Sequence, residues 1–372
     1  MNKKIGYLVG LVLVFVIIVV GVKKISFSRS TTDSITIGAV ISLTGGASPW
    51  GAYGKNGIDL AVKTMNASGG INGRAVKVVM EDDHTDPKQG VSAFQKLVTT
   101  DKVQGIIGGV FDFTAQPLIP LAATNDIPFI SPANFHIAGG FDLNEQSFVM
   151  LSDLDKTVSK LEPVITSKSF KKMAVIHYQS TFGKEIAKTL TTMTRRLEKG
   201  DSMDVPYSQI GNNDWKTMIL KLKKEGVDAV FLDMVANDPL TFMKQARQLG
   251  FAPVVITYNG ALDAFIDKGD KELLENVTVL NWEVSSPAFI KLYQDEYGVL
   301  PAKSAEKYFD ATYVLATALA NTSRSSQASQ YIATHSFVTP SGAIVFTPEH
   351  SIKDSKVEVG VVRNGSLISS SI

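Results

Sequence analysis

Strand and helix patterns alternate along most of this sequence, starting at residue 35. Residues 35–41 form a short run rich in β-branched residues, which is typical of a buried strand. After a turn, apolar residues recur at helical spacing from Ile58 to Met65, and this pattern ends at Gly69 and Gly70. Repetition of a strand followed by a helix predicts parallel sheets with helices on their faces. The expected fold class is therefore α/β.

The alternation continues in two blocks of similar plan, which meet near residues 148–155. Further strands are predicted at residues 76–80, 103–107, 128–130, 173–177, 229–232, 254–257 and 277–280. Helices are predicted after the N-cap Asp86 and Pro87, from about Thr114, and at residues 182–198, 239–249 and 302–321. A polar loop is predicted at residues 323–329, and hairpin strands at 342–368 around Asn364 and Gly365.

The first 24 residues are predicted to be a membrane anchor. Two lysines precede the apolar residues 5–22, an 18-residue stretch. As a helix it is about 27 Å long, close to the hydrocarbon core of about 30 Å. The following Lys23 and Lys24 are a poor context for signal cleavage, so an uncleaved transmembrane helix is favoured, with a removed signal segment as the alternative. Residues 25–34, rich in Ser and Thr, are predicted to be a flexible tether.

Composition narrows the possible functions. Lys and Arg number 37 against 36 Asp and Glu, so the net charge of +1 does not favour a nucleic-acid partner. The absence of cysteine excludes disulfides, thiol nucleophiles and cysteine-ligated metals. No nucleotide-binding, hydrolase or metalloprotease motif occurs, and no two of the five histidines have i, i+4 spacing. We expect neither an enzyme nor a resident cofactor. The carboxylates of Glu81, Asp82, Asp83 and Asp86 are expected to bind loop amides, with a metal loop as the alternative.

Several loops are similar to those of one known family. They are Leu43-Thr44-Gly45-Gly46, Trp50-Gly51, residues 65–73, residues 81–89, residues 108–117, Ile130-Ser131-Pro132-Ala133, residues 178–183 and residues 244–250. Together they resemble the leucine/isoleucine/valine-binding proteins, the solute-binding components of branched-chain amino-acid ABC transporters, over about residues 35–364. The resemblance implies the type I periplasmic-binding, or Venus-flytrap, fold. In this fold two doubly wound lobes, joined by three crossovers, enclose a ligand in a cleft.

The resemblance also implies domain limits and a role. Lobe 1 is expected at residues 35–150 with part of 281–340, and lobe 2 at 151–280 with part of 341–372. The expected role is to carry a small organic solute, of the amino-acid, amide or amine class, to an ABC permease and its ATPase. The lobes are then expected outside the cytoplasm, in the periplasm or at the cell surface. The alternative is a membrane-tethered flytrap that senses a ligand and acts on a partner protein.

Nine residues are candidates for the ligand site by this resemblance. Trp50 matches an aromatic residue of the cleft, Ala133 a small residue whose carbonyl binds an ammonium group, and Asn259 lies near an ammonium-binding acid. Phe135 and Phe182 replace a threonine and a tyrosine. The remaining candidates are Asp112, Thr114, Asn134 and Asn237. Other readings stay open: Trp50 packs the start of a helix, Asp112 caps the helix near Thr114, Phe135 and Phe182 belong to the core, and Asn237 caps a helix.

Asp112 bears on the class of ligand, because it stands where the family usually has a serine that binds a carboxylate. A ligand carboxylate about 4 Å away would be repelled by about 4 kcal/mol at an effective dielectric constant of 20. Phe135 removes a further hydroxyl donor. These two differences from the family pattern, at Asp112 and Phe135, favour a neutral or cationic solute such as an amide or an amine. The alternatives are that Asp112 turns away or that an amino acid binds in another pose.

Overall fold

The computed structural model describes residues 34–135, 137, 143–211, 213–234, 237–259, 271–282, 284–302 and 304–369. Residues 34–372 form one compact unit. The expected membrane anchor at residues 1–24 and almost all of the tether lie outside the described residues. Among the helices that are described, none combines the length and hydropathy needed to cross a bilayer.

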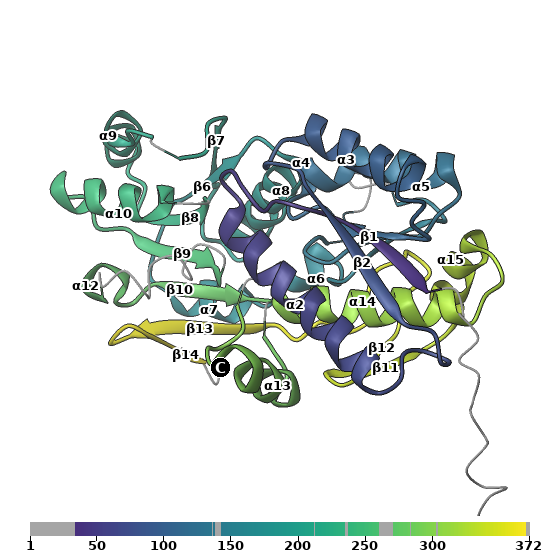
Figure 1. The fold of residues 1–372 in the computed structure, drawn as a ribbon. Coiled ribbons are helices and arrows are strands. Elements are labelled where there is room, and N and C mark those ends of the chain that lie inside the picture. Colours follow the sequence, from purple (N-terminus) through teal and green to yellow (C-terminus); the bar gives the residue numbers. More distant parts are fainter. Residues whose placement is uncertain are drawn as a thin grey trace, which may run out of the picture. The chain divides into compact units, whose positions relative to one another are not determined.

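The first sheet has five parallel strands in the order β2-β1-β3-β4-β5. Its strands β1 and β2 lie side by side in Figure 1. Its helices follow the strands in sequence, as the alternating pattern predicts. The strands are β1 (Ile35–Ile41), β2 (Val76–Asp82), β3 (Ile106–Gly108), β4 (Phe129–Ser131) and β5 (Ser147–Val149). The helices are α2 (Ser48–Ala67), α3 (Pro87–Thr99), α4 (Asp112–Ala115), the 3₁₀ turn η1 (Gln116–Leu118) and α5 (Ile119–Asn125).

The second sheet has seven strands in the order β14-β13-β10-β9-β8-β6-β7. The parallel strands are β6 (Met173–Tyr178), β7 (Met203–Tyr207), β8 (Ala229–Asp233), β9 (Val254–Tyr258) and β10 (Thr278–Asn281). An antiparallel hairpin of β13 (Glu358–Arg363) and β14 (Ser366–Ser369) extends it. Its neighbouring helices are α6 (Leu154–Ser159), α7 (Glu162–Ser167), α8 (Thr181–Arg196), α9 (Lys216–Lys224), α10 (Asp238–Gln248) and α12 (Lys271–Leu274).

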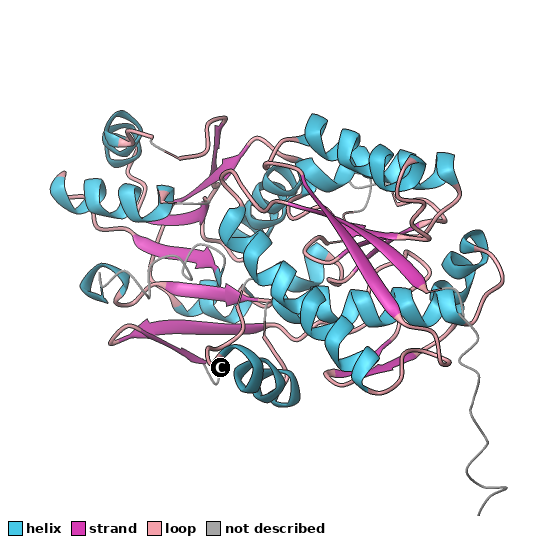
Figure 2. Ribbon diagram, in the orientation of Figure 1, coloured by secondary structure: helices cyan, strands magenta, loops and turns pink. Residues whose placement is uncertain are grey.

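The chain passes between the two sheets after β5, after β10 and before β13. Between the last two passages lie α13 (Pro287–Tyr297), α14 (Ala305–Ala320), α15 (Ser325–Thr334) and the small strands β11 (Phe337–Thr339) and β12 (Gly342–Ile344). Phe289, Phe309 and Phe337 from this segment share an apolar core with Ile37 and Trp50 of the first block. The segment from α13 to β12 therefore completes the core of the first sheet before the chain returns to the second sheet. Figure 2 shows the helices packed around the strands.

Most predicted elements are confirmed, and the differences have local causes. The strand predicted at residues 35–41 has those bounds, and the hairpin turns at Asn364 and Gly365, both of which have positive φ. The polar loop predicted at residues 323–329 is wrong, because α15 begins at Ser325. The first turn of this helix is polar and therefore resembles a loop in the sequence. One face of the helix is nevertheless apolar, because Ala328 and Ile332, one helical turn apart, are buried.

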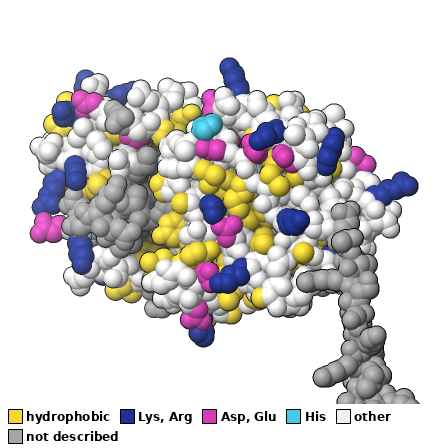
Figure 3. All heavy atoms as spheres, viewed as in Figure 1, with side chains coloured by type: hydrophobic (Ala, Val, Ile, Leu, Met, Phe, Trp, Pro, Cys, Tyr) yellow, Lys and Arg dark blue, Asp and Glu magenta, His cyan; other side chains and the backbone are white. Residues whose placement is uncertain are grey.

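The surface agrees with the near-neutral composition. On the face shown in Figure 3, basic and acidic side chains lie intermixed rather than gathered into a patch of one sign. Oppositely charged side chains of the described residues form ion pairs, such as Lys96 with Glu81, whose nitrogen and oxygen are 2.6 Å apart. Exposed pairs of this kind contribute little to stability.

Candidate functional site

A cavity of about 70 Å³ lies where strands of both sheets end. Its walls come from segments that follow the carboxyl ends of β3, β4, β9 and β10, and from the first turns of α2 and α8. Such edges of parallel sheets are where doubly wound proteins bind ligands. The lining residues are Trp50, Val110, Phe111, Asp112, Ala133, Asn134, Phe135, Phe182, Tyr258, Asn259 and Trp282.

Seven of the nine candidate residues line this cavity: Trp50, Asp112, Ala133, Asn134, Phe135, Phe182 and Asn259. The other two do not. The hydroxyl of Thr114 is bonded at the start of its own helix, accepting from the N–H of Phe111 at 3.1 Å and donating to the carbonyl oxygen of Phe111 at 3.0 Å. Asn237 is exposed before α10, where its carbonyl oxygen accepts from Thr241. Asn237 thus stands at the helix start, as the capping alternative expects, although its side chain forms no capping bond there.

Four lining residues were not among the candidates: Val110, Phe111, Tyr258 and Trp282. Tyr258 is the last residue of β9, and Trp282 directly follows β10. Both positions could have been found from the sequence, because the predicted strands 254–257 and 277–280 end just before them and carboxyl ends of parallel strands carry sites. Phe111 likewise immediately precedes the candidate Asp112.

Aromatic rings form one wall of the cavity. Phe135 from the first block stacks on Phe182 of the second, with ring centres 5.9 Å apart. Trp282 meets Phe135 edge-on at 5.0 Å and stacks with Tyr258 at 4.8 Å. Phe135 is only 4% exposed and also belongs to the apolar core, so the core and cleft readings of this residue both hold. The rings join the two blocks through offset and edge contacts of favourable geometry.

Asp112 is bonded to a helix of the other block. Its Oδ2 accepts from the N–H of Phe182 at 2.8 Å, and Ser180 and the N–H of Thr181 also bond to its carboxylate. The reading that Asp112 caps the helix near Thr114 is wrong, because Asp112 is itself the first residue of α4 and turns to the N-terminus of α8. A carboxylate at a helix N-terminus is favourable because unpaired N–H groups point at it. Burial nevertheless raises the pKa of Asp112.

A second buried carboxylate, Asp233, lies beside this one. It ends β8, is 3% exposed and receives hydrogen bonds from the Tyr258 hydroxyl and the N–H of Tyr178. Burial first, and then the negative charge of Asp112, raise the pKa of Asp233 to about 7. Its Oδ2 accepts no hydrogen bond from any described residue. The two blocks therefore bring two acids into electrostatic contact, one of them in the cavity wall and the other behind Tyr258.

The amide of Asn134 is held in place by the first block. Its Nδ2 donates to the carbonyl oxygen of Gly109 at 2.9 Å and to the hydroxyl oxygen of Ser131 at 2.7 Å. Both amide hydrogens are thereby committed to the protein. Asn259 Oδ1 accepts from the N–H of Trp282 at 3.3 Å and so ties the ends of β9 and β10 together.

In the acidic loop, Asp82, Asp83 and Asp86 accept from backbone N–H groups as expected, Asp83 from that of Thr85 at 2.8 Å. Glu81 instead pairs with the side chain of Lys96. Asp82 accepts from the N–H groups of Leu43 at 3.0 Å and His84 at 2.8 Å. Asp83 accepts from the Ser42 hydroxyl at 2.5 Å, and Asp86 caps α3 through the N–H of Lys88 at 2.8 Å. These bonds fix the loop beside the start of α2, which carries Trp50.

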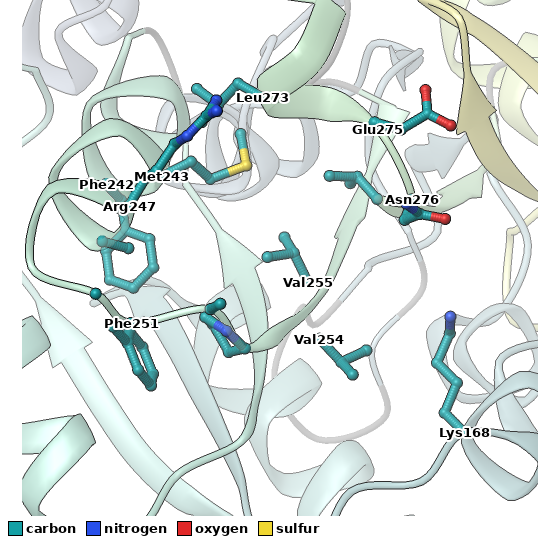
Figure 4. Close-up of a pocket in the computed structure, with 15 residues that line it drawn as sticks. Lys168, Phe242, Met243, Arg247, Phe251, Val254, Val255, Leu273, Glu275 and Asn276 are labelled. Atoms are coloured by element: carbon teal, nitrogen blue, oxygen red, sulfur yellow. The ribbon is translucent and has the colours of Figure 1, made fainter.

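A larger cavity, of about 410 Å³, lies elsewhere in the second block. Val254 and Val255 begin β9 and Asn276 precedes β10, so it sits at the amino ends of these strands. The close-up in Figure 4 shows that apolar side chains, including that of Met243, line part of this cavity. None of the nine candidate residues lines it. The smaller cavity is the candidate site because it lies at the carboxyl ends and is walled by both blocks.

Comparison with known proteins yields a consistent set of relatives. A family model described as periplasmic binding protein matches residues 34–366. Leu/Ile/Val-binding protein homolog 3 of Brucella melitensis is 28% identical over 246 residues, which are 63% of this chain and 64% of the relative. The Leu/Ile/Val-binding protein of Escherichia coli K12 is 27% identical over 236 residues, 62% of this chain and 63% of the relative. The matched region thus spans less than two thirds of each relative's length.

Solved structures share the fold. The branched-chain amino-acid transporter substrate-binding protein LivJ of Streptococcus pneumoniae, in complex with isoleucine, has a TM-score of 0.78 at 22% identity and covers 91% of this chain and 100% of its own. A solute-binding protein of an ABC transporter from R. palustris, in complex with benzoate, has a TM-score of 0.77 at 16% identity and covers 91% and 95%. At these identities the likeness concerns the fold.

Proposed function

This chain belongs to the periplasmic binding protein family, and from that premise we propose that it is a solute-binding protein that carries a small organic solute to an ABC permease and its ATPase. The observation that carries the proposal is the cavity at the carboxyl ends of both sheets, with walls from both blocks. The curated relatives are named as binding proteins for branched-chain amino acids, which supports a solute of similar size.

We propose that the two blocks are lobes that close over the solute. The division at residues 35–150 with part of 281–340, and 151–280 with part of 341–372, is supported by the core that α13–α15 share with the first sheet and by the hairpin in the second. A solute that contacts both lobes binds the closed form better and so shifts the equilibrium towards it. The bond from Phe182 to Asp112 joins the lobes and belongs to the closed form.

We also propose that residues 5–22 anchor the protein in the membrane with the lobes outside the cytoplasm. The length and hydropathy of this stretch, which lies outside the described residues, support the anchor. The periplasmic family supports the location of the lobes. An anchored binding protein keeps its solute close to the permease.

A binding screen tests the proposed function. The purified protein is mixed with amino acids, amides, amines and aromatic acids, and the thermal midpoint of unfolding is followed. A true solute raises the midpoint, because it binds only the folded protein. Solute released by denaturing natively purified protein is identified in parallel by mass spectrometry. A protein that carries no solute and responds to no compound in the screen would contradict the function.

A further inference from the structure

The described residues that line the candidate site include one charged side chain, Asp112. No Lys, Arg or His is among them. A second acidic side chain, Asp233, lies behind this wall and bonds to the lining residue Tyr258. The site is therefore electronegative on both sides, with Asp112 contributed by the first lobe and Asp233 by the second.

None of the described groups that hydrogen-bond to the two acids carries a full positive charge. His177, the cross-strand neighbour of Asp233, bonds instead to the carbonyl oxygen of Tyr178 and to Asp204. Asp112 is bonded by Ser180 and by backbone N–H groups, and Asp233 by Tyr258 and the N–H of Tyr178. The N-terminus of α8 carries only about half an elementary charge. When both carboxyl groups are ionised, the two buried like charges repel each other and disfavour the closed arrangement. A positively charged solute would relieve this repulsion.

The aromatic wall suits the same kind of solute. Phe135, Phe182, Tyr258 and Trp282 all line the cavity, and their rings contact one another face to face and edge-on. Organic cations bind well to such aromatic surfaces when water is excluded, by cation–π attraction. The apolar part of an amine would fill the remaining space. The cavity of about 70 Å³ limits the solute to a compact body.

Among the described lining residues, no cationic side chain is present to pair with a carboxylate. Asn134 has committed both amide hydrogens to Gly109 and Ser131. A carboxylate about 4 Å from Asp112 would lose roughly a thousandfold in affinity at an effective dielectric constant of 20. The site thus discriminates against free amino acids by charge, although their apolar side chains would match its walls.

We propose that this site takes a compact organic monocation that lacks a carboxylate, with Asp112 and Asp233 as countercharges and Phe135, Phe182 and Trp282 as walls. The inference rests on the proposed function and narrows its substrate class to small alkylamines. In this arrangement the cation bridges the lobes, so its binding and their closure are coupled.

Four compounds with related branched apolar bodies test the inference by calorimetry on the full-length protein in detergent. They are isopentylamine, 4-methylpentanamide, 4-methylpentanoate and leucine. We expect isopentylamine to bind at least about a hundredfold more tightly than leucine or 4-methylpentanoate and about tenfold more tightly than the neutral amide. Asp112→Asn should reduce amine affinity by about tenfold or more, while Asp214→Asn, which alters an exposed carboxylate, should leave it unchanged.

Asp233→Asn provides a second test if Asp112→Asn folds poorly. It should also weaken amine binding, because it removes one countercharge without touching the cavity wall. Leucine or the amide binding as tightly as the amine would overturn the inference, as would full amine affinity in both variants. Failure of all four compounds would overturn it too. In that case a solute recovered from the native protein would still uphold the proposed function, so the two failures are distinguishable.

Discussion

At the residue scale, the carboxylate of Asp112 faces two sets of groups. It lines the cavity on one side and accepts hydrogen bonds from the start of α8 on the other. These bonds hold the carboxylate in one orientation, so that its position at the cavity is fixed before a solute binds. The neighbouring Asp233 is the more deeply buried of the two acids. Its ionisation therefore has the larger effect on the stability of the protein.

The stability of the protein should fall as pH rises. The pKa of Asp233 is about 7 in the folded protein, against 3.8 for an ordinary Asp. Between about pH 4 and pH 7 the folded protein therefore retains a proton that the unfolded chain has released, and the free energy of unfolding decreases across this window. Asp233 accounts for up to about 4 kcal/mol of the decrease. Urea unfolding followed by circular dichroism at about pH 4 and pH 8 measures it.

The Asp233→Asn variant isolates this contribution. It should show a smaller decrease than the wild type over the same interval, whereas Asp214→Asn should keep the wild-type decrease. A remaining slope is expected in the Asp233→Asn variant, because burial raises the pKa of Asp310 to about 6 and acts in the same direction. An unchanged pH dependence in Asp233→Asn would show that this carboxyl group does not titrate as the structure indicates.

At the element scale, the packing of α2 against α14 depends on one glycine. These helices make the most extensive contact between any two elements of the described chain. Gly57 of α2 is buried, and a Cβ atom at this position would lie 2.2 Å from the carbonyl oxygen of Ala305. A side chain could rotate away from the added Cβ atom, but the backbone carbonyl of Ala305 cannot. The two helices would therefore have to move apart.

Gly57→Ala should therefore destabilise the protein by about 1–3 kcal/mol, even though alanine favours helix formation. Gly46→Ala is the matched control, because a Cβ atom there meets nothing within 4 Å. We expect the control to change the free energy of unfolding by less than about 0.5 kcal/mol. Chemical unfolding of both variants compares them directly, and equal stabilities would show that the two helices are not held at this distance.

At the scale of the whole molecule, the solute is expected to contact both lobes. Trp50 stands on the first and Phe182 on the second. Truncating either to alanine should weaken binding of the solute found in the screen by about 1–3 kcal/mol, through lost aromatic contact. Phe251→Ala is the control, because Phe251 lines the larger cavity instead. Calorimetry measures all three. Normal binding by both cleft variants would exclude these residues from the site.

The proposed membrane anchor at residues 5–22 is also a property of the whole molecule, and it can be tested by cell fractionation. If residues 5–22 span the membrane, the mature protein should begin at or near Met1 and sediment with membranes after cell lysis. A version that begins at Thr32 should appear in the aqueous fraction with the same thermal midpoint. Mass spectrometry of the purified protein reads the mature start directly. A start between residues 28 and 33 would replace the anchor with a cleaved signal segment.

The sequence by itself determined the elements whose causes are local. The β-branched run at 35–41, the Asp86-Pro87 helix start and the Asn364-Gly365 turn each depend on a few neighbouring residues, and each is found as predicted. Motifs in the loops also sufficed to recognise the family. They directed attention to seven residues that line the cavity. Whether these residues bind a solute remains a prediction.

The tertiary structure decided what depends on contacts between distant parts of the chain. The helix that Asp112 contacts lies 70 residues away along the chain, and its local sequence suggested the nearer helix instead. Tyr258 and Trp282 enter the cavity because β9 and β10 end at the same edge of one sheet. The proximity of Asp112 to Asp233 likewise arises only when the two blocks pack together. Local preferences act over a turn or two of chain, whereas burial and charge depend on which segments the fold brings face to face.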